Sequence, residues 1–248
     1  MRYFLDISYK GTNYHGWQFQ KNAHTLQAEI ENALSKRLGA TIAIMGSGRT
    51  DAGVHAKQQI AHFDTTVSFD TELLIFRLNR FLSPDIAVNS IVEVQPEAHA
   101  RFNANERAYQ YFIHQHKDPF KQHASYYFPK VLNLEEMNKA AAFLMGTHDF
   151  ESFSRVKTEV NNFICVIKQA EWQIQNDSIM FSVTANRFLR GMIRALVGTL
   201  LEVGLGKLSV EDFVKVIEKR DRKAAAMSVP AMGLYLSKVA YPDSVYLK

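Results

Sequence analysis

Cysteine is nearly absent from this sequence, which has only Cys165 among its 248 residues. A single thiol cannot form an intramolecular disulfide, nor a metal site built from several cysteines. Long uncharged apolar runs are absent too, and the chain begins with MRYFLDISY, which is not a signal-peptide pattern. We therefore expect no membrane span and no secretion signal, and we expect the protein to be cytoplasmic.

A dominant charge of either sign is also missing. Lys and Arg together number 29 against 25 Asp and Glu, which gives a formal net charge of +4. This balance permits an acidic partner such as a nucleic acid without requiring one. Because 47% of the residues are hydrophobic and 22% are charged, we expect a globular protein with a substantial core.

The first part of the chain predicts alternating strands and helices. Thr25 can cap a helix that Gly39 ends, and Asp70 can cap a second helix. We expect the order β-α-β-β-α-β over residues 3–9, 26–38, 41–45, 58–66, 71–82 and 86–94. This order is compatible with a ferredoxin-like sheet carrying its helices on one face.

The second part of the chain roughly repeats that order. We expect strands at 107–115, 163–174, 178–185 and 233–242, and helices at 133–146, 186–204 and 210–219. Asn176 and Asp177 mark the turn of a hairpin, and no low-complexity linker separates the two parts. The sequence thus predicts an α+β protein with two halves, residues 1–104 and 105–248, and a cleft between them.

The loop GSGRTDAGVHA, residues 46–56, combines three glycines with Arg49 and Asp51. Glycines allow close backbone approach, and Arg49 is near enough in sequence to orient the Asp51 carboxylate and keep it ionised. One interpretation is therefore a loop that presents Asp51 to a ligand, and the other is a tight turn with a local ion pair. The loop does not match a phosphate-binding P-loop, which needs a Gly-Lys pair.

His55 and His62 follow this loop and raise the possibility of a metal site. Their spacing does not fit a pair of ligands on one helical face, and residue 62 lies within a strand pattern. Two histidines without a further obvious ligand more often fill a core or make hydrogen bonds. We expect no metal here.

Three arginines follow one another at helical spacing in the expected helix 186–204. Arg187, Arg190 and Arg194 would share a face if that helix begins near residue 186. A row of arginines without interleaved acids is typical of a surface that binds phosphates. The alternative, a solvated helix face, usually includes glutamate or lysine, so we favour the phosphate-binding interpretation.

Aromatic residues lie close to basic ones in the strand 107–115. Tyr109 follows Arg107 by two residues, and its ring is suited to stack on an unpaired base. Tyr111 and Ile113 continue the same side of the strand, so core packing is the alternative interpretation of Tyr109.

Five blocks of the sequence together resemble the tRNA pseudouridine synthase A family. In chain order the blocks are YKGTNYHGWQFQ, GRTDAGVHA, HARFNANERAYQYFI, RFLRGMIRALVGTLLEVG and PAMGLYLSKVAYP. The resemblance covers nearly the whole chain. It implies an α+β fold of two ferredoxin-like halves forming a cleft, with the helices on the outer face.

The resemblance also implies roles for individual residues. Asp51 matches the catalytic aspartate, Tyr109 the tyrosine that stacks on the target base, and Arg194 the basic residue that pairs with the aspartate. Leu234 matches an apolar residue of the pocket, and Arg49 is expected to help extrude or hold the target nucleotide. Arg187 and Arg190 then become candidates for binding the RNA. Many relatives carry an arginine near the position of Cys165, which departs from that pattern.

The implied substrates are uridines 38, 39 and 40 in the anticodon stem-loop of tRNA, and the implied assembly is a homodimer. The isomerisation breaks the N1–C1′ bond and joins C5 to C1′ of the same nucleotide. Nothing is oxidised and no group is supplied, so we expect no cofactor.

Two other functions compete with the isomerase. A tRNA-binding or folding module with a silent site would bind the same partner, but the presence of Asp51, Tyr109 and Arg194 favours catalysis. A metal-dependent hydrolase would use Asp51, His55 and His62, whose spacing is poor for metal ligation.

Overall fold

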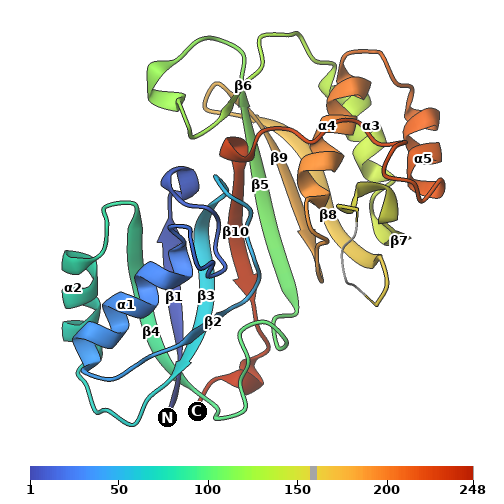
Figure 1. Ribbon diagram of the computed structural model, residues 1–248. Helices are drawn as coiled ribbons and strands as arrows, with labels where there is room; N and C mark the ends of the chain where they lie inside the picture. The colour runs from blue at the N-terminus through green and yellow to red at the C-terminus, as the bar shows by residue number, and fades with distance from the viewer. Residues whose placement is uncertain (157–160, 248) are drawn as a thin grey trace. The chain divides into compact units, whose positions relative to one another are not determined.

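A computed structural model of the protein describes residues 1–156 and 161–247 (Figure 1). The chain forms two compact units. The first contains Met1–Glu106 and Tyr235–Lys248, and the second contains Arg107–Leu234. The sequence-based division at residues 104 and 105 lies close to the first boundary, but it assigns the last segment to the other half. No helix in the described residues is both long and apolar enough to cross a bilayer.

The first unit is built on β1 (Arg2–Tyr9), which pairs antiparallel with β3 (His55–Asp64) and β4 (Ile86–Val94). The short β2 (Ile44–Gly46) pairs antiparallel with β3 near the far end of that strand. With α1 (Leu26–Leu38) and α2 (Thr71–Phe81), the order along the chain is β-α-β-β-α-β, as the sequence predicts. The strand order β4-β1-β3-β2 is that of a ferredoxin-like sheet.

The last strand, β10 (Leu234–Ala240), belongs to the first unit because it pairs in parallel with the beginning of β3. Tyr235 lies opposite His55 and Leu236 opposite Ala56. The following residues stay with this unit, since the N–H of Gln95 donates to the Val245 carbonyl at 2.9 Å. Long-range strand pairing, which local periodicity does not report, is why the sequence assigned this segment differently.

Capping explains the helix boundaries of the first unit. Asp70 accepts a hydrogen bond from the Leu73 N–H at 2.7 Å, and Gly39 ends α1 in the left-handed conformation at φ 67°. Thr25 occupies the N-cap position of α1, but within the described chain its hydroxyl makes no capping hydrogen bond. The prediction that Thr25 caps this helix is therefore right in position and wrong in chemistry.

The second unit contains an antiparallel sheet in the order β5-β9-β8-β7. Its strands are β5 (Glu106–His114), β7 (Gly146–Asp149), β8 (Ile164–Gln175) and β9 (Ser178–Ala185), with β6 (Tyr126–Tyr127) parallel to β5. Asn176 and Asp177 form the β8–β9 turn at φ 46° and 59°. The α+β fold class is thus confirmed in both units.

The described residues of the second unit also form three helices, which are labelled in Figure 1. They are α3 (Leu134–Ala142), α4 (Met192–Gly204) and α5 (Val210–Glu218). Asn133 and Ser209 cap α3 and α5 by accepting the N–H groups of Glu136 and Asp212. α3 contacts β8, α4 and α5, and every residue of α4 except Arg194 and Glu202 is buried. Short 3₁₀ turns cover Gly11–Asn13, Pro119–Lys121, Glu151–Phe153, Ala231–Gly233 and Asp243–Val245.

The helix expected over residues 186–204 begins only at Met192, which corrects the sequence prediction. Asn186 instead extends the sheet: its N–H donates to the Val166 carbonyl at 3.1 Å, and its side-chain Oδ1 accepts from the Val166 N–H at 2.9 Å. Gly191 then turns the chain in the left-handed region at φ 73° before α4 starts. Residues 187–190 are consequently not helical.

Candidate active site

The loop that carries Asp51 joins β2 to β3, and buried Gln59 of β3 holds its first part. The Ser47 hydroxyl donates to Gln59 Oε1 at 2.5 Å, and Gln59 Nε2 donates to the Gly48 carbonyl at 3.0 Å. The Ser47 N–H also bonds the Ile60 carbonyl at 2.7 Å. Gln59 has no exposed surface, so this brace is part of the core. Gln59 is not predictable as part of the site from local sequence, because a glutamine in a strand pattern carries no local sign of this role.

The end of β1 and the segment that follows it hold the same loop from the other side. The Trp17 N–H donates to the Thr50 carbonyl at 3.1 Å, and the hydroxyls of Tyr9 and Thr50 lie 2.8 Å apart. The N–H of Val54 closes a turn on the Asp51 carbonyl at 3.1 Å, with Gly53 at φ 78°. Asp51 is half-buried. The structure thus presents this carboxylate from a loop fixed at both ends.

Arg49 has an exposed side chain on this loop, two residues before Asp51. Its Nε donates to Gln18 Oε1 at 2.9 Å, and Gln18 Nε2 donates in turn to Gln27 Oε1 at 2.9 Å. The block YKGTNYHGWQFQ therefore contacts the block GRTDAGVHA through Gln18. Residue types alone did not predict Gln18 as the partner of Arg49.

His55 and His62 accept backbone hydrogen bonds within the first unit. His55 Nδ1 accepts from the Gly11 N–H at 3.1 Å, and the His55 ring stacks on Tyr235 with centroids 4.5 Å apart. His62 Nδ1 accepts from the Ala100 N–H at 3.1 Å. Burial lowers the pKa of His62 to about 4, because the charged imidazolium would lose solvation there. Among the described residues, no group of three or more His, Cys, Asp or Glu side chains is placed so that it could hold a metal ion.

Tyr109 lies on β5 opposite Val183 of β9, in a row of residues on the same side of the strand. The next members of that row, Tyr111 and Ile113, have no exposed surface, whereas Tyr109 is half-buried. Its ring meets the Phe188 ring edge-on, with centroids 5.2 Å apart and planes at 85°. Core packing thus accounts fully for Tyr111 and Ile113 but leaves part of Tyr109 accessible.

Arg194 is one of the two residues of α4 that are not buried. Its Nε donates to the Val229 carbonyl at 2.7 Å, and the Val229 N–H donates to the Arg194 carbonyl at 3.1 Å. Tyr111 bonds the next residue of that segment through its hydroxyl, which donates to the Pro230 carbonyl at 2.8 Å. Burial raises the pKa of the Tyr111 phenol, partly offset by the charge of Arg194.

Leu234 begins β10 and is buried. The preceding Gly233 lies directly on Tyr111, since a Cβ built on Gly233 would stand 2.7 Å from the Tyr111 Cζ. In the second unit the structure therefore brings the segment 229–234 onto Arg194 and Tyr111.

The arginines expected on one helical face are separated. Arg194 alone lies on α4, while Arg187 and Arg190 lie on the irregular segment before it, so the predicted row at helical spacing is wrong. Arg190 is exposed, and its carbonyl accepts the Arg155 N–H at 2.9 Å. The charge of Arg187 acts on buried Cys165, whose pKa burial raises to about 11 against that influence.

Comparison with known proteins gives a match over most of the chain. A family model described as tRNA pseudouridine synthase matches residues 7–103 and 140–242. A protein of Parabacteroides distasonis named tRNA pseudouridine synthase A is 47% identical over 246 residues, covering 99% of this chain and 98% of its own length. Proteins of the same name are 46% identical in Bacteroides thetaiotaomicron, covering 99% of this chain and 92% of that one, and 40% identical in Bacillus subtilis, covering 98% and 100%.

Proposed function

The chain belongs to the tRNA pseudouridine synthase family of isomerases, and on that premise we propose that Asp51 carries out the conversion of tRNA uridine to pseudouridine. The observation that carries this proposal is the rigid presentation of a half-buried carboxylate by the loop 47–54. The same loop contains the GRTDAGVHA block through which the chain resembles the family.

The reaction is balanced within one nucleotide. The N1–C1′ bond breaks, the base turns, C5 bonds to C1′, and the proton lost from C5 is replaced by one gained at N1. No oxidant, reductant or group donor is needed, which suits a site whose chemistry rests on one acid. Bond cleavage builds positive character on the sugar, which the Asp51 carboxylate stabilises. Asp51 acts as the nucleophile towards the sugar or the base, or as the base that removes a sugar proton.

Two residues of the second unit complete the proposed chemistry. Arg194 supplies the positive charge that pairs with the Asp51 carboxylate, and Tyr109 stacks on the target base. The half-buried state of Tyr109 and the fixed guanidinium of Arg194 support these roles. Leu234 supplies apolar surface for the base, and Arg49 holds or helps to extrude the nucleotide.

We further propose that the targets are uridines 38, 39 and 40 of the anticodon stem-loop, and that the active form is a homodimer acting in the cytoplasm. Extruding a stacked uridine costs a few kcal/mol, which contacts to phosphates and stacking must offset. Arg187 and Arg190 are the proposed phosphate contacts. Light scattering tests the dimer, and mapping of pseudouridine in tRNA from cells lacking the protein tests the positions.

The test of the central proposal is tritium release from tRNA labelled at C5 of uridine. We expect Asp51→Asn to reduce release by a hundredfold or more, because removing an essential acid–base or nucleophilic group has effects of about that size. Asp177→Asn is a matched control, since residue 177 lies in the exposed β8–β9 turn, where asparagine is well accommodated. Normal turnover by Asp51→Asn would overturn the assignment, and tRNA binding without any release by the parent protein would favour the silent binding module.

A further inference from the structure

The segment Ala225–Val229, here called the strap, runs along α4 and bonds to it at two places. The Val229 N–H donates to the Arg194 carbonyl at 3.1 Å, and the Ala226 N–H donates to the Thr199 Oγ1 at 3.1 Å. The Thr199 hydroxyl itself donates to the Ala195 carbonyl at 2.8 Å. The strap is therefore hydrogen-bonded to α4 near Arg194 and again more than one turn further along.

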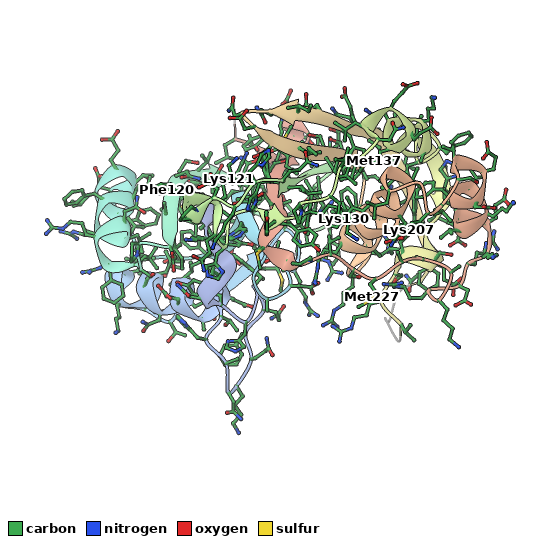
Figure 2. The ribbon with its side chains drawn as sticks, turned by 90° about the horizontal axis from the view of Figure 1, so that it is seen from above. Phe120, Lys121, Lys130, Met137, Lys207 and Met227 are labelled. Atoms are coloured by element: carbon green, nitrogen blue, oxygen red, sulfur yellow. The ribbon has the colours of Figure 1, made fainter. Side chains whose placement is uncertain are left out.

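Gly198 makes this close approach possible. A Cβ built on Gly198 would stand 2.0 Å from the Met227 carbonyl oxygen, closer than any real side chain permits. Met227, labelled in Figure 2, is 88% exposed, and its backbone carbonyl is the group that lies nearest Gly198. A glycine within an apolar helix costs helix stability, and here it leaves space for the strap.

The Arg222 side chain holds the strap through hydrogen bonds that begin at its first residue, Ala225. Its Nη1 donates to the carbonyls of Ala225 and Ala226, each at 3.1 Å, and its Nη2 donates to the Ser228 Oγ at 3.2 Å. One planar guanidinium thus fixes three residues of the strap at once, a geometry that the single ammonium of a lysine cannot reproduce. Arg222 is half-buried, which limits competition from water.

The strap in turn fixes the side chain of Arg194. Arg194 Nε donates to the Val229 carbonyl at 2.7 Å, which uses one of the five N–H donors of the guanidinium and sets the plane of the group. The two terminal nitrogens carry the other four N–H groups of the guanidinium and form the edge with which arginine binds a carboxylate or phosphate. A guanidinium held in this way meets an anion without first having to be ordered.

We propose that Arg222 is a positioning residue for the isomerisation, because it folds the strap that orients Arg194. This inference rests on the proposed function through the role of Arg194. Arg222 acts on the reaction through residues 225–229, at a distance from the reacting atoms.

The first test compares steady-state kinetics of Arg222→Gln with those of Lys223→Gln. Arg222→Gln should lower kcat about tenfold and change the KM for tRNA by less than about twofold, since small displacements of a catalytic group cost tenfold to a hundredfold in rate. Lys223→Gln removes a neighbouring positive charge from an exposed side chain outside the strap and should leave kcat unchanged. A KM effect in Arg222→Gln with normal kcat would overturn the positioning role, because it would make Arg222 a binding residue.

A double-mutant cycle separates this inference from the proposed function. If Arg222 acts through Arg194, then Arg194→Lys combined with Arg222→Gln should be no slower than Arg194→Lys alone. If the rate losses of the two single variants multiply in the double variant, the inference is overturned. Full activity of Arg194→Lys would instead overturn the role of Arg194, whereas a slow Arg194→Lys beside a normal Arg222→Gln would overturn only the positioning role.

A second pair of variants keeps the test valid if Arg222→Gln does not fold. Thr199→Val has nearly the same volume but removes the oxygen that accepts the Ala226 N–H, while Thr199→Ser keeps it. We expect Thr199→Val to lower kcat severalfold without a matching change in KM. Thr199→Ser should keep kcat close to that of the parent protein. Equal kcat values in the two variants would show that the strap does not position Arg194.

Discussion

Gly16 lies directly against the carbonyl oxygen of Thr50, the residue before Asp51. A Cβ built on Gly16 would stand 2.6 Å from that oxygen, and Gly16 has a φ of 93°. The neighbouring Trp17 N–H donates to the same oxygen at 3.1 Å. The position of the Asp51 loop therefore depends on the absence of a side chain at residue 16.

We expect Gly16→Ala to displace this loop and to lower kcat at least tenfold, because an alanine there meets backbone atoms that cannot rotate away. Gly39→Ala is the matched control: Gly39 also has a positive φ, 67°, but a Cβ there would have nothing within 4 Å. Both variants should lose roughly 1 kcal/mol or more of stability from backbone strain, whereas only Gly16→Ala should lose kcat. Equal kcat values would contradict the importance of this contact.

Arg190→Ala and Arg187→Ala should weaken tRNA binding while leaving kcat at saturating tRNA nearly unchanged. Each lost phosphate contact should reduce the slope of log K against log salt concentration by roughly 0.7 to 0.9. Lys139→Ala is a suitable control, because Lys139 is an exposed cation on α3 that is compensated by ion pairs with Glu135 and Glu136. A salt slope identical to that of the parent protein would remove both arginines from the RNA interface.

His62 should make stability depend on pH between about pH 4 and 6.5. Burial, reinforced by the charges of Arg2 and His99, lowers the pKa of folded His62 to about 4, whereas an unfolded histidine titrates near 6.5. The unfolded chain therefore takes up a proton in this range that the folded chain does not bind. The contribution to stability is complete above pH 6.5 and is lost as the pH falls towards 4, by up to roughly 3 kcal/mol.

The variant His62→Asn isolates this contribution. Its side-chain oxygen can accept the Ala100 N–H as His62 Nδ1 does, but it does not titrate in this range. Urea denaturation at several pH values should give a smaller loss of the free energy of unfolding between pH 6.5 and 4 than in the parent. If the free energy of unfolding changes with pH in the same way in the variant and the parent, His62 is not the source of this pH dependence.

Cys165 should be unreactive in the folded protein. The thiol has no exposed surface, and burial raises its pKa to about 11, so the reactive thiolate is scarce at pH 8. A chromogenic disulfide reagent should therefore label the native protein slowly and should label one thiol per chain after denaturation. Rapid stoichiometric labelling without denaturant would contradict this burial.

Local sequence signals predicted the elements whose boundaries depend on local contacts. Asp70 caps its helix, and Asn176 and Asp177 form their turn, because each signal acts within four residues. The predicted start of α4 at residue 186 was wrong. The arginine spacing is compatible with a helix, but hydrogen bonds between Asn186 and Val166, twenty residues away, keep this segment beside the sheet. The same is true of the candidate site. Its glycines and charges allowed the Asp51 loop to be identified from the sequence, but the contacts of Gln59 and Gly16 that hold this loop join distant segments and could not be predicted.

The return of β10 to β3 also bears on how the protein is made. A ribosome releases the polypeptide from its first residue onwards, so β3 emerges long before Tyr235 and Leu236 can lie beside it. The second unit is one uninterrupted stretch, and its last residue leaves the exit tunnel before the first unit is complete. Pairing next to the Asp51 loop must therefore wait until β10 has been synthesised, and a chain stopped before residue 234 would lack a strand of the first unit rather than of the second.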